Sequence, residues 1–138
     1  MIIDAKDKLL GRLSTYAAKQ VLLGNKVEII NCEDAVVSGK RSNILANYIR
    51  RIDRRAPTKG PYLYKSPDFF VKRTIRGMLP FKRDRGQNAY KLIRCHVGHP
   101  ENLKVEKISE LEKNASVSRL SIGHVKVKDI CRAIGGKQ

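Results

Sequence analysis

Four carboxylates are the residues of this chain best placed for acid–base chemistry. Asp4, Asp7, Glu33 and Asp34 follow two apolar segments and could meet at one edge of a sheet. Paired carboxylates of this kind can donate and accept protons during catalysis. However, no nucleophile or histidine accompanies them at a recognisable spacing, so the pattern argues against an enzyme.

Two nucleotide-binding patterns fail on spacing. In residues 38–42, a phosphate-binding loop would need a glycine where Asp34 stands and a serine or threonine where Arg41 stands. A dinucleotide fingerprint would need three spaced glycines after the first strand, and only Gly11 is there. A small nucleotide-dependent α/β enzyme is therefore a disfavoured alternative, and it predicts nucleotide binding that survives high salt. We expect no small-molecule substrate.

The cysteines indicate neither a disulfide framework nor a metal site. Cys32, Cys95 and Cys131 are odd in number and far apart, which fits a reducing, intracellular setting. Cys95-His96 with His99 is the nearest approach to a metal cluster, but no second ligand pair at zinc spacing accompanies it. We expect no metal and no cofactor.

Basic residues are concentrated in the middle of the chain. The 138 residues carry 29 Lys and Arg against 13 Asp and Glu, a formal net charge of +16. Residues 1–39 are neutral overall, residues 40–94 have a net charge of +13, and residues 95–138 have a net charge of +3. So large and localised a charge predicts a polyanionic partner. Nucleic acid is the leading candidate, and an anionic membrane surface is the second.

Nothing in the sequence predicts insertion into a membrane or secretion. No apolar run approaches the roughly 20 residues of a membrane span. Residues 1–5 lack the basic segment and long apolar stretch of a signal peptide. We therefore expect a cytoplasmic protein.

The hydrophobic periodicity predicts alternating strands and helices. A strand, a helix and a strand follow one another within the first part of the chain, which makes a βαβ unit with parallel strands. This alternation favours one α/β domain over residues 1–138, although residues 101–122 show no long periodic pattern. Residues 35–37 form either a short strand or part of the next loop. The other expected elements are strands at residues 1–5, 26–31 and 91–97, helices at residues 10–22, 44–52 and 127–134, and a helical turn at residues 87–90.

Residues 66–86 predict a short helix that presents cations. The Ser66 side chain can cap free backbone N–H groups, Pro67 suits the first helical turn, and Pro80 cannot continue the helix. One face is apolar, with Val71, Ile75, Met78 and Leu79. The other face carries Lys72, Arg73 and Arg76, and a basic loop follows at residues 82–86. This arrangement suits a phosphate backbone, while an ordinary solvated helix face is an equal alternative for the helix alone.

A second basic stretch precedes this helix. Four arginines cluster within six residues at the end of the helix predicted at residues 44–52. Cations favour a helix C-terminus, but this cluster is larger than that interaction explains. Residues 56–65 are extended, basic and aromatic, so a tyrosine such as Tyr62 could stack on a base. A surface loop whose tyrosines pack on the core is an equal alternative. Arg12 lies near the positive start of the first helix, which is unfavourable unless an anion is close; plain solvent exposure is the alternative there.

Several short motifs follow one another in a specific order. The first part of the chain carries Asp4-Ala5, Leu10-Gly11-Arg12-Leu13, Ala18-Lys19, Leu23-Gly24, Asn31-Cys32-Glu33 and Ser38-Gly39. A further motif consists of Arg76-Gly77-Met78-Leu79-Pro80 with Lys82 and Arg85-Gly86. In order and spacing these motifs resemble the ribosomal protein L13 family of the large subunit, and the motif at residues 76–86 looks like the most distinctive one of that family. The resemblance covers roughly residues 2–98. Archaeal and eukaryotic-type members are more similar at residues 18–24, Gly60-Pro61-Tyr62 and Arg85-Gly86-Gln87.

The resemblance implies a three-layer α/β/α domain with a mainly parallel four-stranded sheet and basic extensions, and it implies no catalytic activity. It also implies binding to large-subunit rRNA, support of early subunit assembly, and contacts with neighbouring ribosomal proteins. A non-ribosomal RNA- or DNA-binding regulator on the same fold is the alternative. The nucleic acid recovered with the protein from cell extract would distinguish the two.

The basic region at about residues 40–94 is expected to bind RNA through phosphates, so recognition should be mostly of shape and backbone. Gly77 and Gly86 are expected to let RNA approach the protein backbone. The predicted RNA-binding residues are Arg12, Lys40, Arg41, Arg50, Arg51, Arg54, Arg55, Lys59, Tyr62, Lys65, Lys72, Arg73, Arg76, Gly77, Lys82, Arg83, Arg85 and Gly86.

Overall fold

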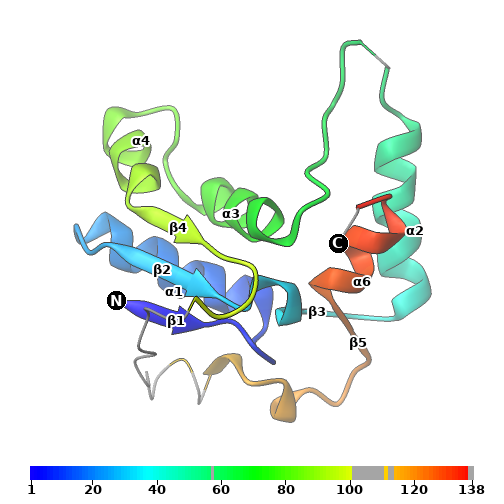
Figure 1. Cartoon of the computed structure of the whole chain (residues 1–138), viewed down its shortest axis with the longest axis horizontal. Helices are drawn as coiled ribbons and strands as arrows, with labels where there is room; N and C mark the ends of the chain where they lie inside the picture. Colours follow the sequence, from blue (N-terminus) through cyan, green and yellow to red (C-terminus); the bar gives the residue numbers. More distant parts are fainter. Residues whose placement is uncertain (57, 101–110, 112–113, 137–138) are drawn as a thin grey trace.

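The computed structural model describes residues 1–56, 58–100, 111 and 114–136 and has a mixed α/β fold (Figure 1). Its N-terminal half contains β1 (Ile2–Asp4), α1 (Leu10–Leu22), β2 (Val27–Ile30), η1 (Cys32–Asp34), β3 (Val36–Ser38) and α2 (Arg41–Asp53). The remainder contains α3 (Pro67–Met78), α4 (Asp84–Lys91), β4 (Ile93–Cys95), η2 (Val117–Arg119), β5 (His124–Lys126) and α6 (Val127–Ala133).

The main sheet is parallel and has the strand order β1-β2-β4. Its register pairs Ile3 with Ile29 and Val27 with Ile93, and all four side chains are buried. Such β-branched residues suit a packed, pleated surface. α1 connects β1 to β2 and covers a face of this sheet (Figure 1). The predicted βαβ unit is therefore confirmed.

The predicted four-stranded parallel sheet is not confirmed, because β3 pairs with β5 in a separate antiparallel ladder. β3 still lies beside the chain that leaves β1. Leu9 and Val36 form an isolated parallel bridge, and the Val36 N–H donates to the Lys8 carbonyl at 2.9 Å. Between β1 and this bridge, Asp7 adopts a left-handed conformation with φ of 53°. The turn interrupts the strand, which explains why β3 does not extend the main sheet.

The predicted three-layer arrangement is also not confirmed. The face of the main sheet opposite α1 carries Ile30, which is fully buried, but also Ile2 and Glu28, which are half-buried, and Arg94, which is exposed. A face covered by a helical layer would bury such positions more completely. The described residues thus give a helical layer on one face, where α1 packs directly against α3.

α3 begins and ends close to the predicted positions, at Pro67 and Met78. Val71 and Ile75 are fully buried and anchor it to the core. Two details of the prediction are wrong. Met78 is 40% exposed, and Phe70, one residue before Val71, is buried in its place. The Ser66 hydroxyl donates to the Asp68 carboxylate and makes no cap to a backbone N–H.

α4 occupies much of the segment that the sequence predicts to be a basic loop. The helix already begins at Asp84, whose negative charge in the first turn favours the positive helix start. Gly86 and Ala89 are its buried residues. Because two small side chains give little apolar periodicity, the sequence pattern predicts only the helical turn at residues 87–90, which lies within α4, and not the whole helix.

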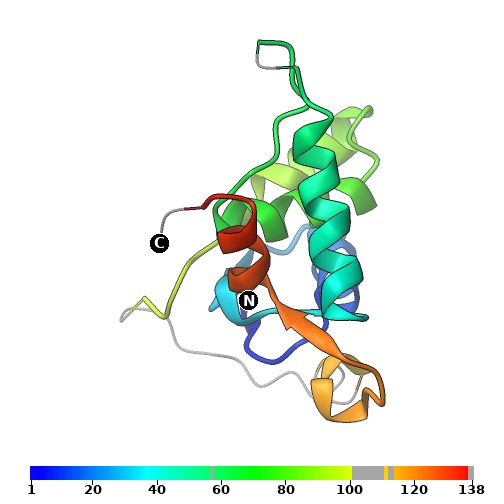
Figure 2. The ribbon, with the colours of Figure 1, turned by 90° about the vertical axis from the view of Figure 1, so that its right-hand side faces the viewer.

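α2 and α6 lie together at one end of the molecule (Figure 1). Arg41 at the start of α2 forms a 3.1 Å ion pair with Asp129 on α6. The predicted C-terminal helix is confirmed at Val127–Ala133, followed by Gly135 in a left-handed conformation. The segment between α2 and α3 projects beyond the rest of the molecule (Figure 2). No helix among the described residues is long and apolar enough to cross a membrane.

Candidate nucleic-acid interface

The predicted cations lie on three parts of the fold, with α3 between α2 and α4 (Figure 1). The first group is at the end of α2, the second is on α3, and the third is at the start of α4. Lys72 is half-buried, and the other cations are exposed. We call these three groups the basic face; it comprises Arg50, Arg51, Arg54, Arg55, Lys72, Arg73, Arg76, Lys82, Arg83 and Arg85.

In the part of the chain that the structure describes, no carboxylate forms an ion pair with the basic face. The acidic side chains are used elsewhere. Asp34 pairs with Lys126 at 3.0 Å and with Lys128 at 3.3 Å, and Glu28 lies 3.3 Å from His96. The hydrogen bond from Lys126 holds the pKa of the Asp34 carboxyl below its ordinary value. A concentrated positive charge without internal compensation attracts a polyanion.

Three of these cations are held against aromatic rings of the protein itself. The Arg51 guanidinium lies 5.2 Å from the centre of the Tyr48 ring. Lys72 lies 4.9 Å from the Tyr90 ring, and Arg76 lies 4.2 Å from the Phe81 ring. Such cation–π contacts fix the stem and head of a side chain but leave its positive charge unneutralised. The cations are therefore positioned and still available to an anion.

Arg73 is held by the segment between α2 and α3. Its Nη1 donates to the Tyr62 carbonyl at 3.3 Å. The Tyr62 hydroxyl in turn donates to the Thr58 carbonyl at 2.9 Å, so this segment is folded on itself next to α3. The Tyr62 side chain does not pack on the core, because it is 61% exposed. Its ring is thus accessible to a base, as one of the two sequence interpretations requires.

A protein-family model described as "Ribosomal protein L13" matches residues 1–102. The chain belongs to the ribosomal protein L13 family. Proteins named "Large ribosomal subunit protein uL13" are similar to it over most of its length. The one from Methanococcoides burtonii is 38% identical over 139 residues, which cover 99% of this chain and 98% of the relative. The one from Methanopyrus kandleri is 38% identical over 129 residues, which cover 90% of this chain and 77% of the relative. The predicted family, with its archaeal-type likeness, is confirmed.

The two glycines of the L13-like motif have different surroundings. Gly77 is exposed, and a Cβ atom added there would meet nothing within 4 Å. Gly86 is buried, and a Cβ atom added there would collide with the Pro80 carbonyl group and lie 2.9 Å from the Phe81 nitrogen. Gly77 fits the prediction of an open backbone. Gly86 has an internal packing reason instead, which the sequence prediction missed.

Two predicted contacts of this L13 member are already used inside the protein. The Arg12 guanidinium donates to the Asn114 carbonyl, which gives it a partner other than RNA. Arg41 is paired with Asp129. Neither residue belongs to the basic face. The remaining predicted cations, Lys40, Lys59 and Lys65, are exposed and lie before α2 or in the segment between α2 and α3.

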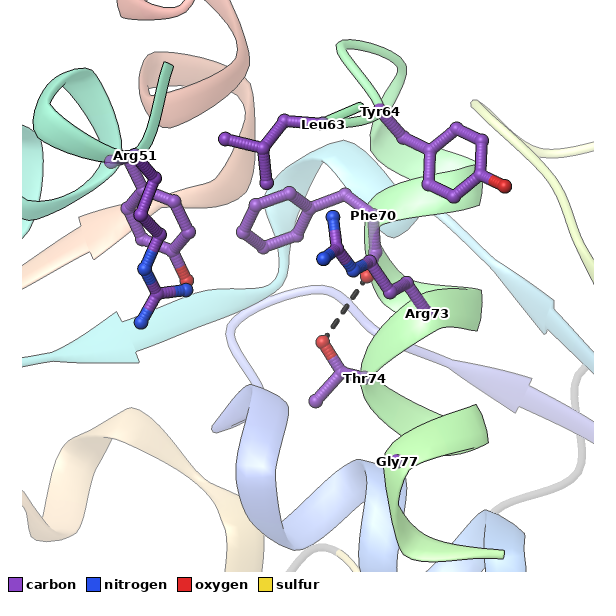
Figure 3. Close-up of a pocket in the computed structure, with 8 residues that line it drawn as sticks. Arg51, Leu63, Tyr64, Phe70, Arg73, Thr74 and Gly77 are labelled. Carbon is purple, nitrogen blue, oxygen red and sulfur yellow. Dashed lines mark hydrogen bonds between the residues drawn. The ribbon is translucent and has the colours of Figure 1, made fainter. Parts of the chain in front are cut away.

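A pocket that the sequence did not predict opens beside the basic face (Figure 3). It has a volume of about 190 Å³ and lies between α2, residues 63–64 and α3. Phe70 and Leu63 give it an apolar wall, and Arg51 and Arg73 reach it from two elements (Figure 3). No sequence signal finds this pocket, because its residues come from three separate segments.

The four carboxylates that could have formed a catalytic site act structurally. Asp4 accepts from the Asn31 side-chain amide at 2.9 Å, and Glu33 accepts from the Gly98 N–H through both oxygens at 3.1 Å. Asp34 is neutralised by Lys126, whose Nζ also lies 3.8 Å from Asp7 Oδ1. Among the described residues, no three His, Cys, Asp or Glu side chains are grouped so that they could hold a metal ion.

Proposed function

We propose that this chain is a structural constituent of the large ribosomal subunit that binds large-subunit rRNA and supports assembly of the subunit. The observation that carries the proposal is the basic face, whose cations have no acidic partner within the described residues. Membership of the L13 family supports it, since relatives such as that of Methanosarcina barkeri, 46% identical over 104 residues, are named large-subunit ribosomal proteins. No catalytic role follows from the family or from the carboxylates.

The mechanism of binding is electrostatic positioning on the RNA backbone. Each Lys or Arg that meets a phosphate releases condensed counterions, which makes the affinity strongly dependent on salt. The α/β core fixes α2, α3 and α4 relative to one another, so the basic face can contact phosphates of several RNA segments at once. Recognition is then mostly of RNA shape and backbone. The exposed predicted residues Lys40, Lys59, Tyr62, Lys65 and Gly77 extend this interface.

The proposed partners are rRNA and neighbouring proteins of the same subunit, in the cytoplasmic ribosome. Exposed apolar side chains, such as Leu23 at 68% and Ile122 at 62%, offer surfaces for protein contacts. We include residues 1–138 in one domain, because the core cluster contains residues from Ile3 to Cys131.

We also propose that in the assembled particle β3 completes a four-stranded sheet next to β1, within a three-layer domain. The parallel bridge between Leu9 and Val36 supports this arrangement. Cryo-electron microscopy of the particle tests it. A third strand that pairs only with β5, or an open second face of the main sheet, would contradict the proposal.

Sedimentation of cell extract through sucrose gradients at low and moderate monovalent salt tests the function. We expect the chain to travel with the large subunit at both salt concentrations, because many phosphate contacts act together. A chain that stays at the top of both gradients, without rRNA, would rule out a ribosomal constituent. Recovery with many messenger RNAs or with DNA would indicate a regulator on the same fold.

A further inference from the structure

The pocket between α2 and α3 combines an apolar wall with two positive charges. Leu63 and Phe70 form the wall, and the Arg51 and Arg73 side chains also line the pocket (Figure 3). Neither guanidinium has a carboxylate partner in the described part of the chain. Arg51 is held over Tyr48, and Arg73 is held by the Tyr62 carbonyl. Both charges therefore stand in fixed places beside an apolar hollow.

We propose that this pocket receives one unpaired nucleobase of the bound RNA, with the phosphates on either side of it at Arg51 and Arg73. The inference rests on the proposed function, since it states what one part of the RNA interface holds. It goes further in one respect: contacts to phosphates carry no information on pairing, whereas a base pocket requires a nucleotide that is out of the helix.

The chemistry of the lining fits a base. A nucleobase has flat faces that stack on aromatic rings and guanidinium planes, and a polar edge that forms hydrogen bonds. Leu63 and Phe70 suit the faces. The Thr74 hydroxyl donates to the Phe70 carbonyl at 3.1 Å, so its oxygen can accept a hydrogen bond from an amino group of the base (Figure 3).

Gly77 gives the pocket its depth. The residue lines the pocket on α3, and a side chain there would meet no atom of the protein. Glycine inside a helix is unfavourable relative to alanine. Because Gly77 lines the pocket, the absence of a side chain there leaves room for an occupant to lie against the backbone of α3.

The charges favour a nucleotide over an apolar protein segment. An apolar segment that covered the pocket would remove Arg51 and Arg73 from water without giving them partners, which is costly. A nucleotide supplies an apolar face for the wall and an anionic phosphate on each side. An acidic protein segment remains the competing occupant, and the experiment below separates the two.

The test compares the full chain with the Gly77→Leu variant, which fills the pocket without changing any charge. The probes are a short single-stranded oligoribonucleotide and a perfect RNA duplex of the same length, measured at the same salt concentration. We expect Gly77→Leu to bind the single strand about tenfold more weakly, the size of one lost base-stacking contact, and to bind the duplex unchanged. Thr74→Leu, which fills the same pocket from the preceding turn of α3, should behave in the same way.

Gly11→Leu is the matched control, because Gly11 is another exposed helical glycine with free space around it and does not line the pocket. We expect it to bind both probes like the wild type. Equal weakening on both probes, or unchanged single-strand binding by folded Gly77→Leu and Thr74→Leu, would overturn the proposal. If Gly77→Leu and Thr74→Leu lose binding to a polyglutamate peptide while their RNA binding is unchanged, the pocket belongs to an acidic protein segment. These results are independent of sedimentation with the large subunit, so the proposal that the pocket binds a base can be wrong while the proposed function stands.

Discussion

Gly86 and Gly77 belong to one sequence motif, but the structure gives only Gly86 an internal reason to lack a side chain. Its hydrogen atom faces the Pro80 carbonyl and the backbone of Phe81, which cannot move without displacing the turn between α3 and α4. This turn is also fixed by hydrogen bonds, since the Gly86 N–H donates to Arg83 and the Arg83 N–H donates to Pro80, both at 2.9 Å.

We therefore predict that Gly86→Ala destabilises the protein, by about 1–3 kcal/mol, because the added methyl group overpacks a rigid turn. Gly77→Ala is the matched control, and it should be neutral or stabilise by up to about 1 kcal/mol, since the site is open and helical. Urea unfolding of the two variants measures the difference. Similar stabilities would show that the turn can adapt to a side chain.

The ion pairs of Asp34 predict a dependence of stability on pH. The hydrogen bond from Lys126 lowers the pKa of Asp34 from its ordinary value of 3.8, and the same contact raises the pKa of Lys126. A lowered carboxyl pKa stabilises the folded state above the unfolded value, and this contribution is lost as the pH falls through the folded pKa. The Lys126 contribution is lost only as the pH rises through its raised pKa.

Asp34→Asn should consequently cost up to about 1 kcal/mol near pH 7, because the pair is only partly buried. The loss should shrink when the free energy of unfolding is measured at about pH 3. Asp53→Asn is the control, since Asp53 is an exposed carboxylate without an ion pair in the described structure. An Asp34→Asn defect of the same size at both pH values would contradict this account.

At the scale of elements, the sequence predicted best where a helix or strand has its own apolar periodicity. α1, α3 and α6 each carry several buried apolar residues at helical spacing, and their positions agree with the prediction to within a few residues. α4 has only Gly86 and Ala89 buried, so its weak pattern predicts only the turn at residues 87–90 and not the full helix. The pairing of β3 with β5 joins residues far apart in the chain, which local patterns cannot reveal.

The candidate site also was predictable from the sequence only in part. The number of cations and their grouping along the chain could be read from the sequence. Some of the partners that hold them could not, because Tyr90 reaches Lys72 only through the packing of α3 against α4, whereas Tyr48 and Phe81 lie within a few residues of Arg51 and Arg76 in the sequence. For the same reason the use of Arg12 and Arg41 inside the protein was not foreseen.

α3 should carry a large share of RNA binding. We predict that Arg73→Ala combined with Arg76→Ala weakens binding to large-subunit rRNA and reduces the slope of log affinity against log salt by about 1 for each lost phosphate contact. Stability should fall by no more than about 1 kcal/mol, since the Arg73 hydrogen bond and the Arg76 contact with Phe81 are exposed.

Filter binding across a series of salt concentrations measures both the affinity and the slope. Lys19→Ala combined with Lys26→Ala is the control, because it removes the same charge from the neutral N-terminal part of the chain. If the two double variants reduce binding equally, net charge rather than the position of α3 determines affinity.

At the scale of the whole molecule, the charge of +16 acts against the isolated fold. Like charges on α2, α3 and α4 repel one another when no polyanion is present. The few ion pairs found in the described structure involve Asp34, Asp129, Glu28 and Asp7, and they lie away from the basic face.

We predict that the free protein becomes more stable as sodium chloride is raised from about 0.05 to about 0.5 M, because the shorter Debye length screens this repulsion. Thermal unfolding followed by circular dichroism measures the effect. Addition of rRNA at low salt should raise the melting temperature further, since a ligand that binds only the folded state stabilises it. A melting temperature that falls with salt would mean that favourable ion pairs outweigh the repulsion.

The aromatic rings beneath Arg51, Lys72 and Arg76 have a consequence for the speed of assembly. Long cationic side chains usually lose conformational entropy when they bind, and that loss slows productive encounters and weakens the complex. Here the loss has largely occurred during folding, so the protein meets its RNA as a rigid template. The RNA must then do most of the adapting, which would let an early-binding protein impose one local conformation on a transcript that is still folding.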